Sequence, residues 1–134
     1  MKLTINTSFQ ENASSQYLLI LVDSEQLQQS AATYQINKFE EITTATQYKA
    51  GLNETLALVG NVPASTNACL VGLGKTAELQ PGKLAKVAQT IIKAAQKKFQ
   101  QISVDISALP VQFHNIFALL LTQAAYAFDE FKSK

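Results

Sequence analysis

The 134-residue sequence has no arginine and no tryptophan, and it has only one histidine and one cysteine. A lone cysteine excludes an internal disulfide bond, and a lone histidine excludes a histidine-rich metal site. Arginine grips phosphate and carboxylate groups through two parallel hydrogen bonds. Its absence therefore weakens any hypothesis of a phosphate or nucleic-acid clamp.

Long hydrophobic runs are missing as well. No apolar stretch approaches the roughly 18–20 residues of a transmembrane helix. Residues 1–5 lack the apolar core of a secretory signal. We therefore expect a cytoplasmic protein with no membrane partner, and the single Cys69 agrees with a reducing compartment.

The composition that remains is typical of a globular domain, with 47% hydrophobic residues, 16% charged residues and a net charge of +1. A chain of this length buries about two thirds of the surface that its unfolded form exposes, so its core needs no disulfide or metal. The length predicts a single domain over residues 1–134.

Five short stretches have the pattern of β-strands. They are residues 2–8, 17–22, 54–60, 68–73 and 102–106. The first alternates apolar and polar residues from the N-terminus, which predicts an edge strand. The second and fourth are continuously apolar, as in strands that are buried on both faces. Residues 61–67 contain Pro63 and predict a loop.

Helical patterns fill most of the remaining chain. Residues 25–49 lack glycine and proline and predict one or two helices, capped by Asp23 and Ser24 and ended by Gly51. The residues expected to point inward are Phe39, Ile42 and Tyr48.

Two further helices follow prolines, which suit a first helical turn. Pro81 opens a helix over residues 81–99, and Pro110 opens the last helix. One apolar stripe of the first comprises Leu84, Val87, Ala88, Ile91, Ile92, Ala95 and Phe99. The inward residues of the second are Phe113, Phe117, Leu120, Leu121 and Ala124.

Buried strands that alternate with helices predict an α/β fold, with a mixed, mostly parallel sheet of about five to six strands and helices on both faces. Residues 68–73, 81–99 and 102–106 are expected to form a right-handed βαβ crossover. The first two strands are separated by about eight residues, too few for a crossover helix, so they are expected to be antiparallel if they pair.

Two glycine motifs overlap after the fourth strand. Gly74-Lys75-Thr76 copies the end of a phosphate-binding P-loop, but Cys69 stands where that motif needs a glycine. Gly72 and Gly74, with Ala77, match the spacing of a dinucleotide fingerprint. That motif needs a helix start inside it and an acidic residue about twenty positions on, and both are missing. We therefore interpret the segment as the structural end of a strand.

His114 and Cys69 form a nucleophile–base pair only if folding brings them together. Cys69 lies in an apolar strand, where a thiol is usually inert packing. Nothing acidic lies within one helical turn of His114, so we expect a packed or surface histidine.

The charged side chains are expected to cover solvated surface. The lysines of the 81–99 helix are Lys83, Lys86, Lys93, Lys97 and Lys98. They form either a patch for an acidic partner or an ordinary polar face. The only aromatic residue among them, Phe99, points inward, which disfavours binding of nucleic acid. The acidic residues Glu40, Glu41, Glu54, Asp129 and Glu130 have no spacing suited to metal binding or acid–base catalysis.

The order of the segments resembles the N-terminal domain of the leucyl (cytosol) aminopeptidase family over essentially the whole chain. Residues 54–63 (ETLALVGNVP) and 68–75 (ACLVGLGK) carry the resemblance, followed by Glu78-Leu79 and a helix rich in alanine and lysine. Residues 126–132 (YAFDEFK) are similar to the segment that closes this domain.

This resemblance implies a macro-domain-like three-layer fold, and a homohexameric parent enzyme that removes N-terminal amino acids from peptides. It also implies a C-terminal catalytic domain, absent from this chain, that binds two divalent metal ions (zinc or manganese) and the peptide. The family's catalytic motif does not occur in the sequence. We therefore assign no catalytic, cofactor-binding or metal residue, and expect a role in hexamer assembly and active-site access.

Two alternatives remain at this point. One is a free-standing macro-like module that binds a nucleotide such as ADP-ribose, although residues 109–111 replace the glycine-rich loop of such modules. The other is an accessory DNA-contact domain that uses the lysine face of the 81–99 helix.

Overall fold

The computed structural model describes residues 2–8, 16–95 and 101–132, with side chains up to residue 127. Its centre is a five-stranded sheet in the order β1-β5-β2-β4-β3. The strands are β1 (Lys2–Asn6), β2 (Tyr17–Val22), β3 (Thr55–Val62), β4 (Ser65–Gly72) and β5 (Gln101–Asp105). Four of them run parallel, and only β3 is antiparallel to its neighbour, β4. The mixed, mostly parallel sheet is confirmed.

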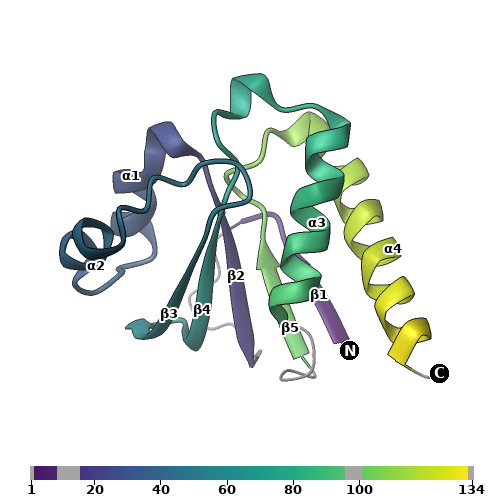
Figure 1. Ribbon diagram of the computed structural model, residues 1–134, viewed down its shortest axis with the longest axis horizontal. Coiled ribbons are helices and arrows are strands. Elements are labelled where there is room, and N and C mark those ends of the chain that lie inside the picture. Colours follow the sequence, from purple (N-terminus) through teal and green to yellow (C-terminus); the bar gives the residue numbers. More distant parts are fainter. Residues whose placement is uncertain (1, 9–15, 96–100, 133–134) are drawn as a thin grey trace.

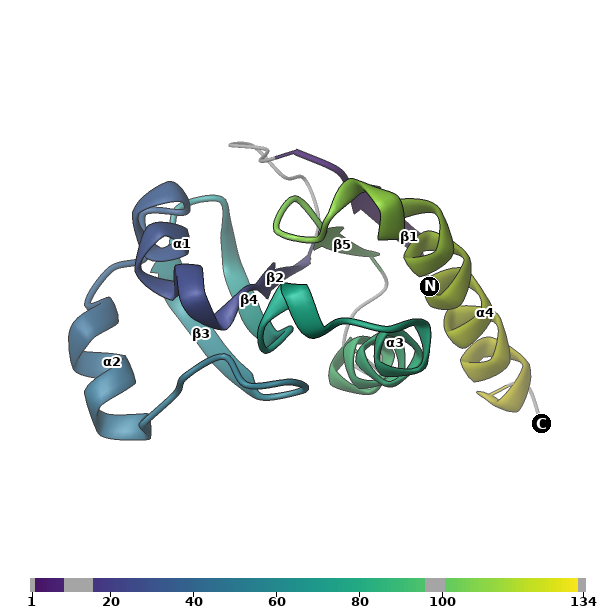
Figure 2. The same cartoon turned by 90° about the horizontal axis from the view of Figure 1, so that it is seen from above.

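Helices cover both faces of this sheet, as predicted. Helices α1 (Leu27–Thr33) and α2 (Phe39–Thr46) lie on one face, and α3 (Pro81–Ala95) and α4 (His114–Lys132) lie on the other (Figure 1, Figure 2). Three short 3₁₀ turns, η1 (Ser24–Gln26), η2 (Thr76–Glu78) and η3 (Val111–Phe113), precede α1, α3 and α4.

Strand β2 is buried on both faces because its side chains alternate between two hydrophobic cores. Leu19 and Leu21 point into the core beneath α3 and α4. Leu18 and Ile20 point into the core beneath α1 and α2. This double burial explains the continuous apolar run in the sequence, since neither face of the strand meets water.

Helix α3 is built as its periodicity predicts. Pro81 is its first residue, and the buried stripe comprises Leu84, Val87, Ala88, Ile91, Ile92 and Ala95. Phe99, Lys97 and Lys98 lie outside the described residues. The helix links β4 to β5, which run parallel with β2 between them. The crossover therefore passes over one strand, and its right-handedness stays a prediction.

The region from 25 to 49 contains two helices, and Phe39 and Tyr48 are buried while Ile42 packs against the same core. Asp23 caps the first turn, since its Oδ1 accepts a hydrogen bond of 2.8 Å from the Glu25 amide. The predicted stop at Gly51 is wrong: α2 ends at Thr46, because Gln47 adopts the left-handed conformation (φ 58°).

One further prediction is wrong, and the antiparallel orientation expected for the first two strands if they pair does not arise. Residues 61–67 are not a loop. Strand β3 ends at Val62 and β4 begins at Ser65, so only Pro63 and Ala64 form the turn between them. The first two strands do not pair. Strand β5 lies between β1 and β2, and all three run parallel. Sequence spacing could not show this, because the intervening strand comes from the far end of the chain.

Strand β1 lies at the edge of the sheet, as predicted, and its Leu3 and Ile5 pack against the core beneath α3 and α4. Helix α4 contributes buried Phe117 and Leu121 to this core. Phe113, Leu120 and Ala124 pack against it partly buried, so the predicted inward face of the last helix is confirmed.

We expect Phe117→Ala to lower the free energy of unfolding by about 3–5 kcal/mol, because it leaves a cavity in a fully buried site. Leu119→Ala on the same helix is the matched control. Leu119 is 56% exposed, so its loss should change stability by less than about 0.5 kcal/mol. Urea denaturation of both variants of the 134-residue domain measures the difference. Equal costs would contradict the assignment of the buried face of α4.

Candidate functional site

The carboxyl ends of the four parallel strands meet at one edge of the sheet, where open α/β sheets usually bind ligands. Strand β2 leads into α1 on one face, and its neighbour β5 leads into α4 on the other. The crevice between the ends of β2 and β5 is therefore the switch point at which a binding site is expected.

A buried carboxyl group lies at this switch point. Asp105, at the end of β5, is 2% exposed. The Tyr34 hydroxyl, from the end of α1, donates to Asp105 Oδ2 at 2.7 Å. The amide and hydroxyl of Ser107 donate to Oδ1 at 2.9 and 2.6 Å. The carboxyl group is thus surrounded by donors from the protein itself.

Burial raises the pKa of the Tyr34 phenol above its ordinary value; the hydrogen bond with Ser107 opposes the rise, and the nearby Asp105 adds to it. The phenol therefore keeps its proton and acts as a donor to Asp105. These contacts connect α1 to the loop after β5 and close the crevice with internal hydrogen bonds. The cavity that remains is about 150 Å³ and is lined in part by Tyr34, Ser107 and Leu21. Ligand sites usually occupy about 300–1,000 Å³.

A second polar contact joins the loops after β2 and β4. Asp23 Oδ2 accepts a hydrogen bond of 2.7 Å from the Thr76 hydroxyl. The Ser24 amide donates to the Gly74 carbonyl at 2.9 Å. Beside these loops lies an open groove of about 580 Å³. Its lining residues are Ser24, Glu25, Gln26, Leu27, Gln28, Gln29, Tyr48, Lys49 and Lys75.

The two glycines of the near-miss motifs serve backbone packing. A Cβ on Gly72 would lie 2.6 Å from the carbonyl carbon of Ala50. Gly74 has a φ of +64°, which favours glycine. Their amides are occupied within the protein: Gly72 donates to the Glu54 carbonyl at 2.7 Å, and Gly74 donates to the Ala50 carbonyl at 3.0 Å. These amides are therefore not directed at a phosphate.

Cys69 and His114 have different hydrogen-bond partners in the structure. The Cys69 thiol is buried and lies 3.5 Å from the Leu70 carbonyl, and burial raises its pKa. His114 Nε2 lies 2.8 Å from the Leu109 carbonyl. A thiol with a raised pKa is a poor nucleophile, because the thiolate is the reactive form.

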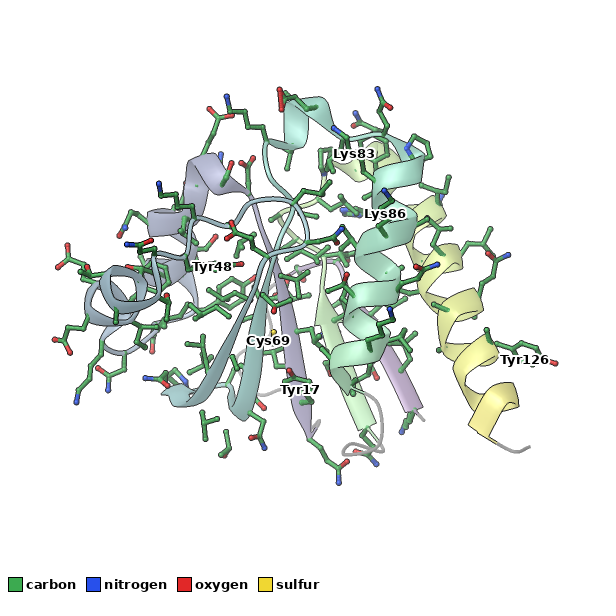
Figure 3. All side chains as sticks on the ribbon, viewed as in Figure 1. Tyr17, Tyr48, Cys69, Lys83, Lys86 and Tyr126 are labelled. Atoms are coloured by element: carbon green, nitrogen blue, oxygen red, sulfur yellow. The ribbon has the colours of Figure 1, made fainter. Side chains whose placement is uncertain are left out.

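The lysines of α3 that the structure describes are Lys83, Lys86 and Lys93 (Figure 3 labels the first two). Lys83 Nζ donates to the Glu78 carbonyl at 3.1 Å and so helps to fix the turn before the helix. Glu54 Oε1 accepts from the Gly51 amide at 2.6 Å.

The other acidic residues show no site either. Glu40 and Glu41 occupy the exposed first turn of α2. The side chains of Asp129 and Glu130 lie outside the described residues. Among residues 2–8, 16–95 and 101–127, no three His, Cys, Asp or Glu side chains are grouped so that they could hold a metal ion.

The polar contacts of Asp105 and Asp23 were not predicted as pairs. Each aspartate ends a buried strand, and this is the one signal in the sequence that could have singled them out. Their partners Tyr34 and Thr76 lie 71 and 53 residues away, and no local pattern connects them.

In the described part of the chain, no helix is long and apolar enough to cross a membrane.

Comparison with known proteins gives a consistent family. The family description "Cytosol aminopeptidase family, N-terminal domain" matches residues 18–134. The chain is 61% identical to a probable cytosol aminopeptidase of Acinetobacter baumannii and 52% identical to one of Acinetobacter baylyi. Both alignments cover 100% of this chain and 28% of the relative. The chain therefore spans about a quarter of the length of these relatives.

The fold has a counterpart of known structure. A mutant of tomato leucine aminopeptidase superposes on 93% of this chain, and on 28% of its own chain, with a TM-score of 0.66. The sequence identity is 14%, so this likeness concerns the fold alone. The expected fold class and the resemblance drawn from residues 54–75 are confirmed.

We expect Gly72→Ala to destabilise the domain by about 1–3 kcal/mol or more, because the new Cβ meets the backbone of residues 50–51. Gly82→Ala is the matched control. Nothing lies within 4 Å of its added Cβ, and alanine favours the helix, so stability should stay equal or rise by up to about 1 kcal/mol. Thermal unfolding compares the two. Equal effects would refute the backbone contact.

Tyr34→Phe should cost about 1–3 kcal/mol, because it removes a donor from the buried Asp105 carboxyl group. Tyr126→Phe removes a hydroxyl from a side chain that is 70% exposed and should leave stability within about 0.5 kcal/mol. The midpoint of denaturant unfolding reports both values. An unchanged midpoint for Tyr34→Phe would show that the contact is not stabilising.

Proposed function

The chain belongs to the cytosol aminopeptidase family as an N-terminal domain, and from this premise we propose that it is the non-catalytic part of a longer, metal-dependent leucyl aminopeptidase. The observation that carries the proposal is the 61% identity, which extends over all 134 residues and covers 28% of the relative. The longer protein removes N-terminal amino acids from peptides and acts in the cytoplasm.

The residues of this chain support a division of labour within that enzyme. The described side chains do not fit a two-metal centre, because histidine occurs once, the thiol is buried and no acidic cluster is present. The carboxyl groups at the strand ends are occupied by internal donors. We therefore place the two divalent metal ions and the bound peptide in the part of the polypeptide that follows this domain in the relatives.

The role of the domain itself is in assembly of the homohexamer and in access to its active sites. Its switch-point crevice is closed by the contacts of Asp105, and its motif glycines are committed to backbone packing. A domain with these properties contributes surface and rigidity to an assembly. Among the residues that the structure describes, no feature favours a nucleotide-binding module or a DNA-contact domain over this role.

The test compares three proteins: the full-length enzyme, a deletion of residues 1–134, and the 134-residue domain. We expect the full-length enzyme to release N-terminal leucine and to lose this activity when a chelator removes the metal. The isolated domain should show no hydrolysis at any metal concentration. The deletion should keep its bound metal and change its oligomeric mass or its preference for peptide length, because the domain governs assembly and access.

Metal analysis, light scattering and rates on peptides of increasing length give these readouts. Hydrolysis by the isolated domain would refute the assignment of a non-catalytic role. A deletion with unchanged mass and unchanged length preference would refute the role in assembly and access while leaving the family assignment intact.

A further inference from the structure

Exposed apolar side chains gather on η3 and on the outward face of α4. Four large hydrophobic residues of the described chain are strongly exposed, and three of them, Val111, Leu119 and Tyr126, lie on η3 and α4. Leu119 and Tyr126 are seven residues apart and therefore lie on one face of the helix. Thr122 lies between them on the same face, and Asn115 lies one turn before Leu119. We call these four residues the α4 stripe. Tyr126 points away from the rest of the domain (Figure 3).

The α4 stripe also lacks charge. No charged residue occurs from His114 to Ala127 except for the titratable His114 itself. Helix α3, which packs beside α4, has Lys83, Lys86 and Lys93 on its polar side. An amphipathic surface helix normally carries charged residues on its outer face, as α3 does. A neutral outer face with exposed leucine and tyrosine is typical of the core of an interface.

The hydroxyl within the stripe is prepared for burial. Thr122 Oγ1 donates to the Ala118 carbonyl of its own helix at 2.8 Å. Burying this hydroxyl therefore leaves no donor without a partner, and the usual penalty for an unsatisfied buried polar group is avoided.

The position of α4 in the chain identifies the occupant. It is the last element of the domain, and Figure 1 marks the C-terminus beside its end. In the relatives, the matching region is the N-terminal domain and makes up 28% of a longer chain. The rest of such a chain therefore continues from the counterpart of this helix. A domain tethered there is held at a high effective concentration next to the α4 stripe.

We propose that the α4 stripe is the docking surface for the domain that follows in the same polypeptide, with Leu119 and Tyr126 as its apolar anchors. This inference rests on the proposed function, since it requires the longer enzyme. The matching surface of the following domain is apolar and neutral where it meets Leu119 and Tyr126. Charged groups at that place would lose their hydration without gaining an ion pair.

The experiment measures thiol accessibility in the full-length enzyme. Leu119→Cys, Tyr126→Cys and the nearly isosteric Thr122→Cys report on the stripe, and Val59→Cys is the matched control. Val59 is 70% exposed and lies on β3, at the opposite edge of the sheet from β1. The native Cys69 is 3% exposed and contributes little background. A maleimide should react at the stripe at least about tenfold more slowly than at position 59, because an interface core excludes water.

Stripe cysteines that react as fast as the control would overturn the proposal, and Thr122→Cys guards against a substitution that itself opens the interface. A photoreactive residue at position 126 then identifies the neighbour. A cross-link within one chain supports the proposal, and a product with the mass of two chains assigns the stripe to a second copy and overturns it.

Peptidase activity, measured in parallel, separates this inference from the proposed function. Fast labelling of an active, metal-dependent peptidase refutes the docking surface alone. Slow labelling with an intrachain cross-link in a protein without peptidase activity refutes the proposed function alone.

Discussion

Strand β2 is the constraint on which the rest of the structure depends. Its six residues are all buried, and alternate side chains enter the two cores on opposite faces of the sheet. Burial of apolar surface contributes about 25 cal/mol per Å² removed from water. Each face of β2 is apolar, so each makes this contribution only when helices cover it. The pairs α1–α2 and α3–α4 are therefore needed together, and the neighbouring strands β4 and β5 supply the hydrogen bonds of both edges of β2.

Around this centre, the carboxyl edge of the sheet is closed by polar contacts. Asp105 accepts from Tyr34 and Ser107, and Asp23 accepts from Glu25 and Thr76. In many α/β proteins the equivalent edge presents such groups to a ligand. Here the same groups connect α1 to the loops after β5 and β4. These contacts therefore hold the loops of this edge together, and the open groove of about 580 Å³ lies beside them.

The candidate site shows where sequence reasoning reaches its limit. The failed spacing at Cys69 and the late helix start at Pro81 were sufficient to argue that Gly72 and Gly74 end a strand. The reason for two glycines at this point was not visible, because the backbone of Ala50 and Gly51 approaches from more than twenty residues away. The same holds for the α4 stripe, since an apolar residue such as Leu119 is classified as buried or exposed only when its helix has been docked.

The sequence by itself determined the approximate positions of the strands and longer helices, the inward faces of α3 and α4, the family resemblance and the lack of a metal-ligand pattern. These follow from periodicities and spacings within a few residues, and such patterns are local. The tertiary structure alone decided that β5 separates β1 from β2, that β3 and β4 form a tight hairpin, and that Tyr34 meets Asp105. Each of these depends on which distant segments share one core, and burial of apolar surface, which is not directional, does not encode that choice in any short stretch of chain.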